Sequence, residues 1–206
     1  AHNKLSAGQV RQKIVDLIAM VGIPSPEQRM KDYPHQLSGG MRQRIMIAMA
    51  LACDPKVLIA DEPTTALDVT IQAQILDLIK SIQTKFGTGI LLITHDLGVI
   101  AEMAHEVAVM YAGKIVEIAD VKAIFRNPLH PYTQGLLRSV PRVDGTTTKH
   151  RLEEIPGVVP NLWHLPPGCS FIDRCPVGID RCRETAPELT AVENRHLVSC
   201  WRVCCD

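Results

Sequence analysis

The stretch VLIADEPTTALD, residues 57–68, decides the fold, because four apolar residues lead directly into two adjacent carboxylates. A short apolar run that does not alternate with polar residues predicts a buried strand. Two further runs of this kind follow, GILLIT at residues 89–94 and VAVMY at residues 107–111. Helix-like segments separate the runs, which indicates a parallel sheet covered by helices on both faces. We therefore expect an α/β protein.

The helices expected around these strands share apolar residues at helical spacing, and they cover residues 9–21, 39–52, 70–86 and 97–104. Thr70 is the expected N-cap of the third helix. In the second helix we expect one apolar face, made by Ile45, Ala48, Met49 and Ala52. Residues 112–119 are expected to form a turn into a more exposed strand, and residues 127–137 a short helical hairpin.

The composition limits the class of protein. The 206 residues carry 22 basic and 22 acidic side chains, and 46% of them are apolar. Balanced charge argues against a nucleic-acid surface built on net charge, and we expect no nucleic-acid partner. No apolar run reaches the ~20 residues that span a bilayer, and the N-terminus has no apolar signal-peptide core. The composition therefore favours a cytosolic protein with a substantial core.

Reactive side chains follow two of the expected strands. Asp61 and Glu62 follow the first strand and His95 follows the next, so all three are expected at the carboxyl edge of the sheet, where α/β proteins bind ligands. One carboxylate there can hold Mg²⁺ through water, and its neighbour can deprotonate an attacking water. Taken one at a time, a capping aspartate, a solvated glutamate and a surface histidine are the simpler explanations.

The order and spacing of three motifs resemble the nucleotide-binding subunits of ATP-binding cassette (ABC) transporters. The motifs are LSGGMRQR at residues 37–44, LIADEPTTALD at residues 58–68 and LLITHD at residues 91–96. The segments YPHQLSGGM, VMYAGKIVE and NPLHPYTQGLL narrow the resemblance to the ATPases of dipeptide and oligopeptide permeases. It runs from about residue 10 to residue 202, and it implies an ABC-type P-loop NTPase cassette that hydrolyses ATP to energise peptide transport.

The resemblance gives each motif residue an expected role. The turn that opens the helix at residue 39 would meet the γ-phosphate of ATP held by a second subunit, since exposed N–H groups favour anions. This turn comprises Ser38, Gly39 and Gly40, with Gln43 and Arg44 in support. The other roles are Mg²⁺ binding by Asp61, water activation by Glu62, γ-phosphate sensing by His95 and coupling of the two sites by Asp68. A plain helix-entry turn is the alternative for the two glycines.

One element of the resemblance is missing from the sequence. A phosphate-cradling loop needs GxxxxGK[ST], and the only Gly-Lys pair, Gly113–Lys114, is followed by Ile115. We therefore expect a truncated gene product or one piece of a larger subunit, inactive alone. The missing strand would lie between residues 89–94 and residues 107–111, so both strands should present unpaired edges.

Three parts are expected along the chain: a helical subdomain remnant at residues 1–53, a RecA-like core at residues 54–126, and a small Cys-rich C-terminal extension at residues 127–206. The partners that the resemblance implies are a second ATPase subunit and the integral membrane permease subunits. The place that it implies is the cytoplasmic face of the inner (plasma) membrane.

Four cysteines of the extension are candidate metal ligands: Cys169, Cys175, Cys182 and Cys200. A Pro- and Gly-rich segment without its own apolar core is typical of a metal-stapled lobe, and a cytosolic location disfavours disulfides. Zinc sites more often show CxxC pairs, whereas [4Fe–4S] clusters accept varied spacings. Some members of the permease branch bind such a cluster. Reduced cysteines without a ligand are the alternative.

Three functions are therefore compatible with the sequence. The resemblance favours an ATPase subunit that energises peptide import. The second is a non-catalytic piece that completes a partner's ATP site through residues 38–40. The third, supported only by the cysteines, is an iron–sulfur module for electron transfer or redox sensing.

Overall fold

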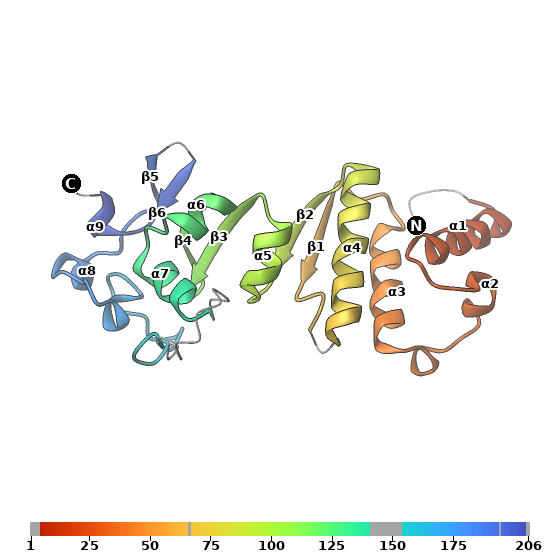
Figure 1. The fold of residues 1–206 in the computed structure, drawn as a ribbon, viewed down its shortest axis with the longest axis horizontal. Helices are drawn as coiled ribbons and strands as arrows, with labels where there is room; N and C mark the ends of the chain where they lie inside the picture. Colours follow the sequence, from red (N-terminus) through yellow and green to blue (C-terminus); the bar gives the residue numbers. More distant parts are fainter. Residues whose placement is uncertain (1–4, 66, 141–153, 194, 205–206) are drawn as a thin grey trace, which may run out of the picture. The chain divides into compact units, whose positions relative to one another are not determined.

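The computed structural model describes residues 5–65, 67–140, 154–193 and 195–204 (Figure 1). The chain divides into two compact units, Ala1–His95 and Asp96–Asp206. Each unit contains a sheet of its own.

The first unit combines helices with a parallel pair of strands. Its elements are α1 (Ala7–Met20), α2 (Pro26–Arg29), the 3₁₀ turn η1 (Pro34–Gln36), α3 (Gly39–Leu51), β1 (Val57–Asp61), α4 (Val69–Phe86) and β2 (Gly89–Ile93). Strands β1 and β2 pair in parallel, with Val57 opposite Gly89 and Asp61 opposite Ile93. Helix α4 connects them, so the predicted strand–helix–strand unit is confirmed.

Helix α4 buries the predicted apolar stripe, which includes Ile75, Leu78, Ile79 and Ile82. The expected N-cap, Thr70, is wrong, because the helix already begins at Val69. Asp68 caps it instead: its backbone is extended and its carboxylate accepts the N–H of Ile71 at 2.9 Å. Aspartate and threonine are both good caps, so propensity alone does not separate them.

The buried face of α3 differs from the predicted one. Of the four residues expected there, only Ala48 is buried, and it is joined by Ile47 and Leu51. Met46 and Met49 are 62% and 70% exposed. The helix is apolar on nearly every side, so its periodicity does not mark the face that packs.

One face of the β1–β2 sheet is uncovered in the part of the chain that the structure describes. Leu58 and Ala60 are buried, but Ile59 is 63% exposed and Leu91 is 52% exposed. The prediction of helices on both faces is therefore wrong for the described residues. Among these residues β2 has no strand on its other side, so the expected open edge is present.

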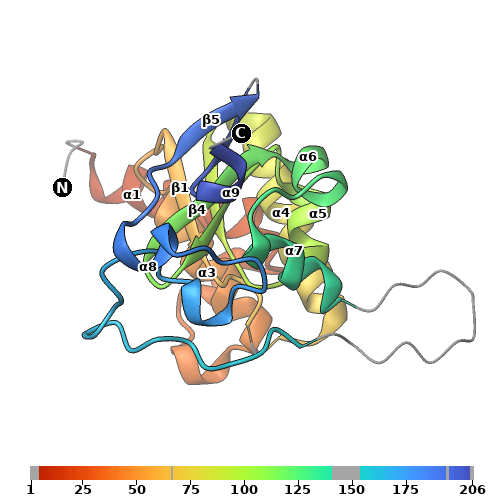
Figure 2. The ribbon, with the colours of Figure 1, turned by 90° about the vertical axis from the view of Figure 1, so that its left-hand side faces the viewer.

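The second unit is built around an antiparallel sheet. Its elements are α5 (Leu97–Met103), β3 (Glu106–Tyr111), β4 (Lys114–Asp120), α6 (Val121–Arg126), α7 (Pro131–Arg138), the 3₁₀ turn η2 (Ile172–Arg174), α8 (Arg181–Glu184), β5 (Thr190–Glu193), β6 (His196–Val198) and α9 (Trp201–Cys204). The strand order is β3-β4-β6-β5. Strand β5, drawn in blue, forms one edge of this sheet (Figure 2). Within the described residues β3 pairs only with β4, so the second expected open edge is also present.

Two predictions for this unit are wrong. Strand β4 is not an exposed strand: Val116, Glu117 and Ala119 are buried, because β4 lies between β3 and β6 inside the sheet. The expected helical hairpin at residues 127–137 is a single helix, α7, which follows extended chain and is capped by His130. Pro131 occupies the first position of α7, where proline is favoured because its missing N–H has no partner within the helix.

An aromatic cluster joins the sheet of the second unit to the cysteine-bearing segment. The ring centroids of Tyr111 and Tyr132 are 4.7 Å apart, and those of Tyr111 and Phe171 are 5.1 Å apart. Phe171 is 2% exposed. This cluster supplies the apolar core that the extension was expected to lack.

Candidate functional site

The structure brings Glu62 and His95 together at the ends of neighbouring strands. Glu62 directly follows β1, and His95 lies two residues beyond β2. Nδ1 of His95 lies 2.8 Å from Oε1 of Glu62. Because an ionised carboxylate only accepts hydrogen bonds, Nδ1 carries the proton in this contact. Two residues that the sequence placed at one sheet edge are thus direct partners.

The second oxygen of Glu62 is held by a residue that the sequence analysis did not single out. The hydroxyl of Thr65 donates to Oε2 of Glu62 at 2.6 Å. The hydrogen bonds from Thr65 and then from His95 hold the pKa of Glu62 below its ordinary value. Glu62 is therefore an anion at neutral pH, which a general base must be. Thr65 lies in the sequence TTALD, residues 64–68, in which only Asp68 was predicted to have a role.

The backbone of Glu62 is in an unusual conformation. Its φ is +43°, in the left-handed region that non-glycine residues seldom adopt. The amide N–H of Glu62 donates to the carbonyl of Ile93 at 2.9 Å, which continues the β1–β2 ladder by one residue. Left-handed backbone at a non-glycine residue costs about 1–3 kcal/mol and is concentrated at functional sites.

The two aspartates of the motif have separate places. Asp61 is the last residue of β1, opposite Ile93, and it is exposed. An exposed carboxylate at a strand end suits Mg²⁺, which takes one or two carboxylates and keeps several waters. Asp68 lies at the start of α4, where its carboxylate caps the helix. Its observed contact is thus a structural one.

The Ser-Gly-Gly turn opens α3 as predicted. Ser38 is the N-cap, and its hydroxyl accepts the N–H of Met41 at 3.3 Å. A Cβ added to Gly40 would lie 2.7 Å from a methyl group of Ile71, whereas one added to Gly39 would lie 3.6 Å from the nearest atom, on Leu67. Gly40 is therefore required for the packing of α3 against α4, and Gly39 has room for a side chain.

The two supporting residues of this turn have different surroundings. Arg44 donates to the carbonyl of Val21 at 2.6 Å and to Oε1 of Gln74 at 3.0 Å. These bonds tie α3 to the end of α1 and to α4, so the expected help from Arg44 in phosphate binding is not what the structure shows. Gln43 is half-buried on the first turns of α3.

The four candidate cysteines converge on one small cavity of the second unit. Cys169, Cys175, Cys182 and Cys200 all line it. The N–H of Cys169 donates to the carbonyl of Cys182 at 2.7 Å. A Cβ on Gly168 would lie only 2.2 Å from that same carbonyl, so this approach of the two segments requires glycine.

The thiols of this cavity are shielded from solvent. Burial raises the pKa of Cys169 and of Cys175, and it raises the pKa of Cys200 to about 11. The space between them is barely enough for one water molecule. Within the described ranges, no three His, Cys, Asp or Glu side chains are arranged to hold a single metal ion. A larger inorganic group would require the thiols to move outward.

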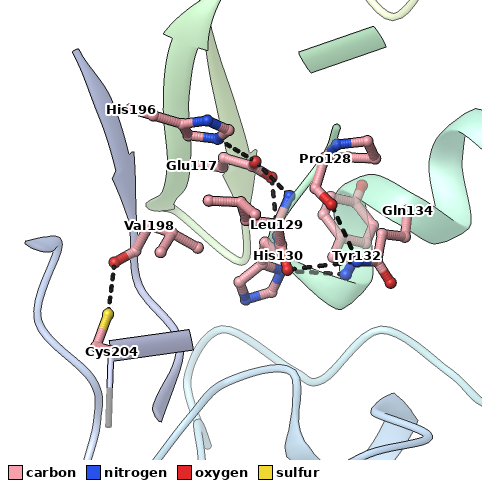
Figure 3. Close-up of polar contacts among 9 residues, drawn as sticks. All are labelled: Glu117, Pro128, Leu129, His130, Tyr132, Gln134, His196, Val198 and Cys204. Carbon is pink, nitrogen blue, oxygen red and sulfur yellow. Dashed lines mark hydrogen bonds and ion pairs between the residues drawn. The ribbon is translucent and has the colours of Figure 1, made fainter. Parts of the chain in front are cut away.

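A buried carboxylate network lies beside this cavity, and no pattern in the sequence predicted it. Glu117 of β4 is fully buried (Figure 3). Oε1 accepts the N–H of Leu129 at 2.7 Å and lies 2.7 Å from Nε2 of His196, while Oε2 accepts the N–H of His130 at 3.0 Å. The network joins β4, the start of α7 and β6.

The ring of His130 is neutral. It is 1% exposed, and burial lowers its pKa to about 4. Its Nδ1 accepts the N–H of Tyr132 at 3.0 Å, so the ring proton is on Nε2. The ring also lines the cysteine cavity. His130 thus connects the Glu117 network with that cavity.

Among the residues that the structure describes, no helix combines the length and the apolar content needed to cross a membrane.

Family models and relatives match most of the chain. A model described as "ABC transporter" matches residues 2–65, and one described as "Oligopeptide/dipeptide transporter, C-terminal region" matches residues 116–182. The "Oligopeptide transport ATP-binding protein AppD" of Bacillus subtilis is 55% identical over 97% of the chain, which spans 60% of that relative. The "Dipeptide transport ATP-binding protein DppD" of Escherichia coli is 54% identical over 92% of the chain, which spans 58% of it.

Solved structures of ABC proteins share part of the fold. CbiO1 of Clostridium perfringens, described as part of the ABC transporter complex cbiONQ, matches 61% of this chain and 49% of its own at a TM-score of 0.53 and 32% identity. The cassette MJ0796, a dimer bound to ADP and Pi, matches 59% of this chain and 51% of its own at a TM-score of 0.51 and 27% identity. The chain spans about 60% of the length of these curated relatives, and along more than 90% of its own length it is similar to the ATP-binding subunits of dipeptide and oligopeptide ABC transporters.

Proposed function

We propose that this chain is part of an ATP-hydrolysing subunit that energises the import of dipeptides or oligopeptides. One observation carries the proposal: Glu62 and His95, from the ends of two parallel strands, are hydrogen-bonded at 2.8 Å. A carboxylate kept ionised by its neighbours and placed at a sheet edge can take a proton from water. The relatives, which are named for oligopeptide and dipeptide transport, support the substrate class.

In this mechanism Glu62 orients and deprotonates the water that attacks the γ-phosphate. His95 donates from Nδ1 to Glu62, which fixes the plane of the carboxylate, and it would donate to the γ-phosphate from Nε2 when that nitrogen also carries a proton. Asp61 would hold Mg²⁺, which supplies charge neutralisation at the phosphate oxygens when it is bound. Gln43 and Asp68 are the remaining proposed contacts around the nucleotide.

The site needs a second subunit. Ser38, Gly39 and Gly40 open a 13-residue helix, whose free N–H groups favour an anion, and we place them on the triphosphate of a partner ATPase. The dimeric state named for MJ0796 supports a dimer. The 206 residues contain no GxxxxGK[ST] loop. Permease subunits at the cytoplasmic face of the membrane are the further proposed partners.

The three expected parts remain as a proposal for this subunit. Residues 1–53 would contribute the signature helix, residues 54–126 the hydrolytic strand ends, and residues 127–206 the extension specific to peptide transporters. The match of the transporter C-terminal model to residues 116–182 supports the last assignment.

The test uses a completed subunit, in which the chain is joined to the portion of the Bacillus subtilis oligopeptide transport protein AppD that it does not cover. Glu62→Gln should abolish ATP turnover and leave ATP binding intact, since the amide cannot accept a proton. Glu106→Gln, at an exposed position of β3, is the matched control and should keep full turnover. Turnover by Glu62→Gln at the control's rate would refute the mechanism.

A second substitution tests the shared site. Gly39→Asp places a carboxylate where the partner's phosphate is proposed to bind, and a Cβ at this position would lie 3.6 Å from the nearest atom, which is an ordinary contact. Turnover should fall sharply while the fold is kept, because an aspartate at a helix N-terminus is itself favourable. Gly39→Ser is the neutral control. The 206-residue chain should show no ATPase activity in the absence of a partner subunit. ATP hydrolysis by this chain without a partner would contradict the shared site.

We propose as a second function that the four cysteines hold a [4Fe–4S] cluster that senses redox state. Their convergence on one cavity supports this assignment, and the thiols would have to move outward to admit the cluster. The donor set suits iron–sulfur chemistry, and the raised thiol pKa values mean that binding would release protons.

Anaerobic purification followed by iron and sulfide assay tests the cluster. The wild-type chain should be brown and contain iron and acid-labile sulfide, and Cys182→Ser should lose both. Cys53→Ser removes an exposed thiol of the first unit and should lose neither. A colourless wild-type protein that contains one zinc would exclude the cluster.

A further inference from the structure

The hydroxyl of Thr65 is hydrogen-bonded directly to Glu62, the proposed base. Thr65 donates from Oγ1 to Oε2 of Glu62 at 2.6 Å, and its backbone N–H donates to the carbonyl of Glu62 at 3.2 Å. Thr65 therefore contacts Glu62 through both its side chain and its main chain. The side chain of Glu62 is 41% exposed, so solvent alone would not fix its orientation.

The two oxygens of Glu62 are held by two different segments of the chain. Thr65 holds Oε2 from three residues downstream, and His95 holds Oε1 from the end of β2. A carboxylate has about four acceptor positions, so each oxygen keeps one for a water molecule. The backbone of Glu62 itself is in the left-handed region, with φ of +43°. The arrangement restricts the carboxylate without occupying it.

We propose that Thr65 is a positioning residue for hydrolysis, whose hydroxyl holds the carboxylate of Glu62 in the orientation that receives the proton of the attacking water. This inference rests on the proposed role of Glu62 as base. It also gives the connection between β1 and α4 a direct link to the base, since Thr65 precedes the helix cap Asp68 by only three residues. Displacement of Thr65 would move the carboxylate.

Kinetics of the completed subunit test the proposal with three variants. Thr65→Val keeps the shape and removes the hydroxyl, so kcat should fall about tenfold or more while the KM for ATP changes less than about twofold. Thr65→Ser restores the hydroxyl and should recover most of kcat. Thr64→Val makes the same change one residue earlier, at a side chain not bonded to Glu62, and should leave kcat unchanged. Equal kcat in the two valine variants, or failure of serine to rescue, would overturn the proposal.

A readout independent of ATPase activity separates this inference from the proposed function. ¹⁵N chemical shifts of His95 in the full 206-residue chain, recorded at pH 8, report which ring nitrogen carries the proton. In the wild type and in Thr65→Ser the proton should be mainly on Nδ1, because Glu62 accepts it. In Thr65→Val the loosened carboxylate should lower that fraction. An inactive completed wild-type subunit would refute the proposed function. Independently of activity, the same tautomer fraction in Thr65→Val as in the wild type would show that Thr65 does not position Glu62.

Discussion

The two sheets of this chain are completed in different ways. The sheet of the first unit is a parallel pair with one apolar face exposed and an open edge at β2. The antiparallel sheet of the second unit draws β5 and β6 from the end of the same chain, and its centre is fixed by the fully buried Glu117. Antiparallel strands need only short connections, whereas parallel strands need crossovers. Glu62 and His95, the proposed hydrolytic residues, follow the strands of the two-stranded sheet, which has the open edge and the exposed apolar face.

Removing the buried carboxylate should give the largest effect on stability. Glu117→Leu leaves the N–H groups of Leu129 and His130 and the ring of His196 without their acceptor. The second unit should lose about 3–5 kcal/mol, as when one partner of a buried pair is removed. Glu106→Leu, at an exposed position of β3, is the control. Urea unfolding followed by near-UV circular dichroism measures both, and equal stability would show that the network is dispensable.

Lowering the pH should weaken the second unit through His130. The folded pKa is about 4 and the unfolded value is 6.5, so only the unfolded chain gains a proton between them. Stability is therefore fully present above pH 6.5 and is lost as the pH falls toward 4, by roughly 3 kcal/mol in total. His130→Asn keeps a helix cap but cannot titrate. Urea unfolding of both proteins from pH 7.5 to 4.5 should give a steeper pH dependence for the wild type, and parallel curves would contradict the assignment.

Adding one methyl group to each unit should have opposite effects. Gly168→Ala places a Cβ 2.2 Å from the carbonyl of Cys182 and should destabilise the second unit by about 1–3 kcal/mol. Gly8→Ala lies in α1 with no atom within 4 Å and should stabilise the first unit by about 0.5–1 kcal/mol. Thermal unfolding of both variants compares them. A tolerated alanine at position 168 would mean that the two cysteine segments separate easily.

The smallest effect is expected on the open face of β1. Ile59→Thr changes a side chain that is 63% exposed, so stability should change by less than about 0.5 kcal/mol, while self-association should fall. Leu58→Thr, on the covered face of the same strand, should cost more than about 2 kcal/mol. Sedimentation velocity and urea unfolding measure the two properties. A large loss for Ile59→Thr would show that this face is covered in solution.

The sequence predicted the features that depend on local pattern. The parallel pairing of β1 with β2, the buried stripe of α4 and the meeting of Glu62 with His95 all follow from apolar periodicity and from the rule that parallel strands end at one edge. The convergence of the cysteines was also expected, although their ligand was not decided by spacing.

The failures have physical causes of two kinds. The sequence could not predict which face of α3 packs or which face of β1 is uncovered, because both sides of these elements are apolar. Residues 112–119 were expected to lead into a more exposed strand, yet Glu117 is fully buried, which is rare for a charged residue unless it is paired. Its partners are backbone amides 12 and 13 residues away and a histidine 79 residues away, which no local pattern contains.

That last separation has a consequence for synthesis on the ribosome. The β3–β4 hairpin is made long before His196, so the nascent chain carries Glu117 for 79 residues before its final partner exists. During that time water must solvate the carboxylate, because a buried charge without its partner is costly. The second unit can therefore close only after residue 196 has been made, and a chain released before that point would keep this sheet open to proteases.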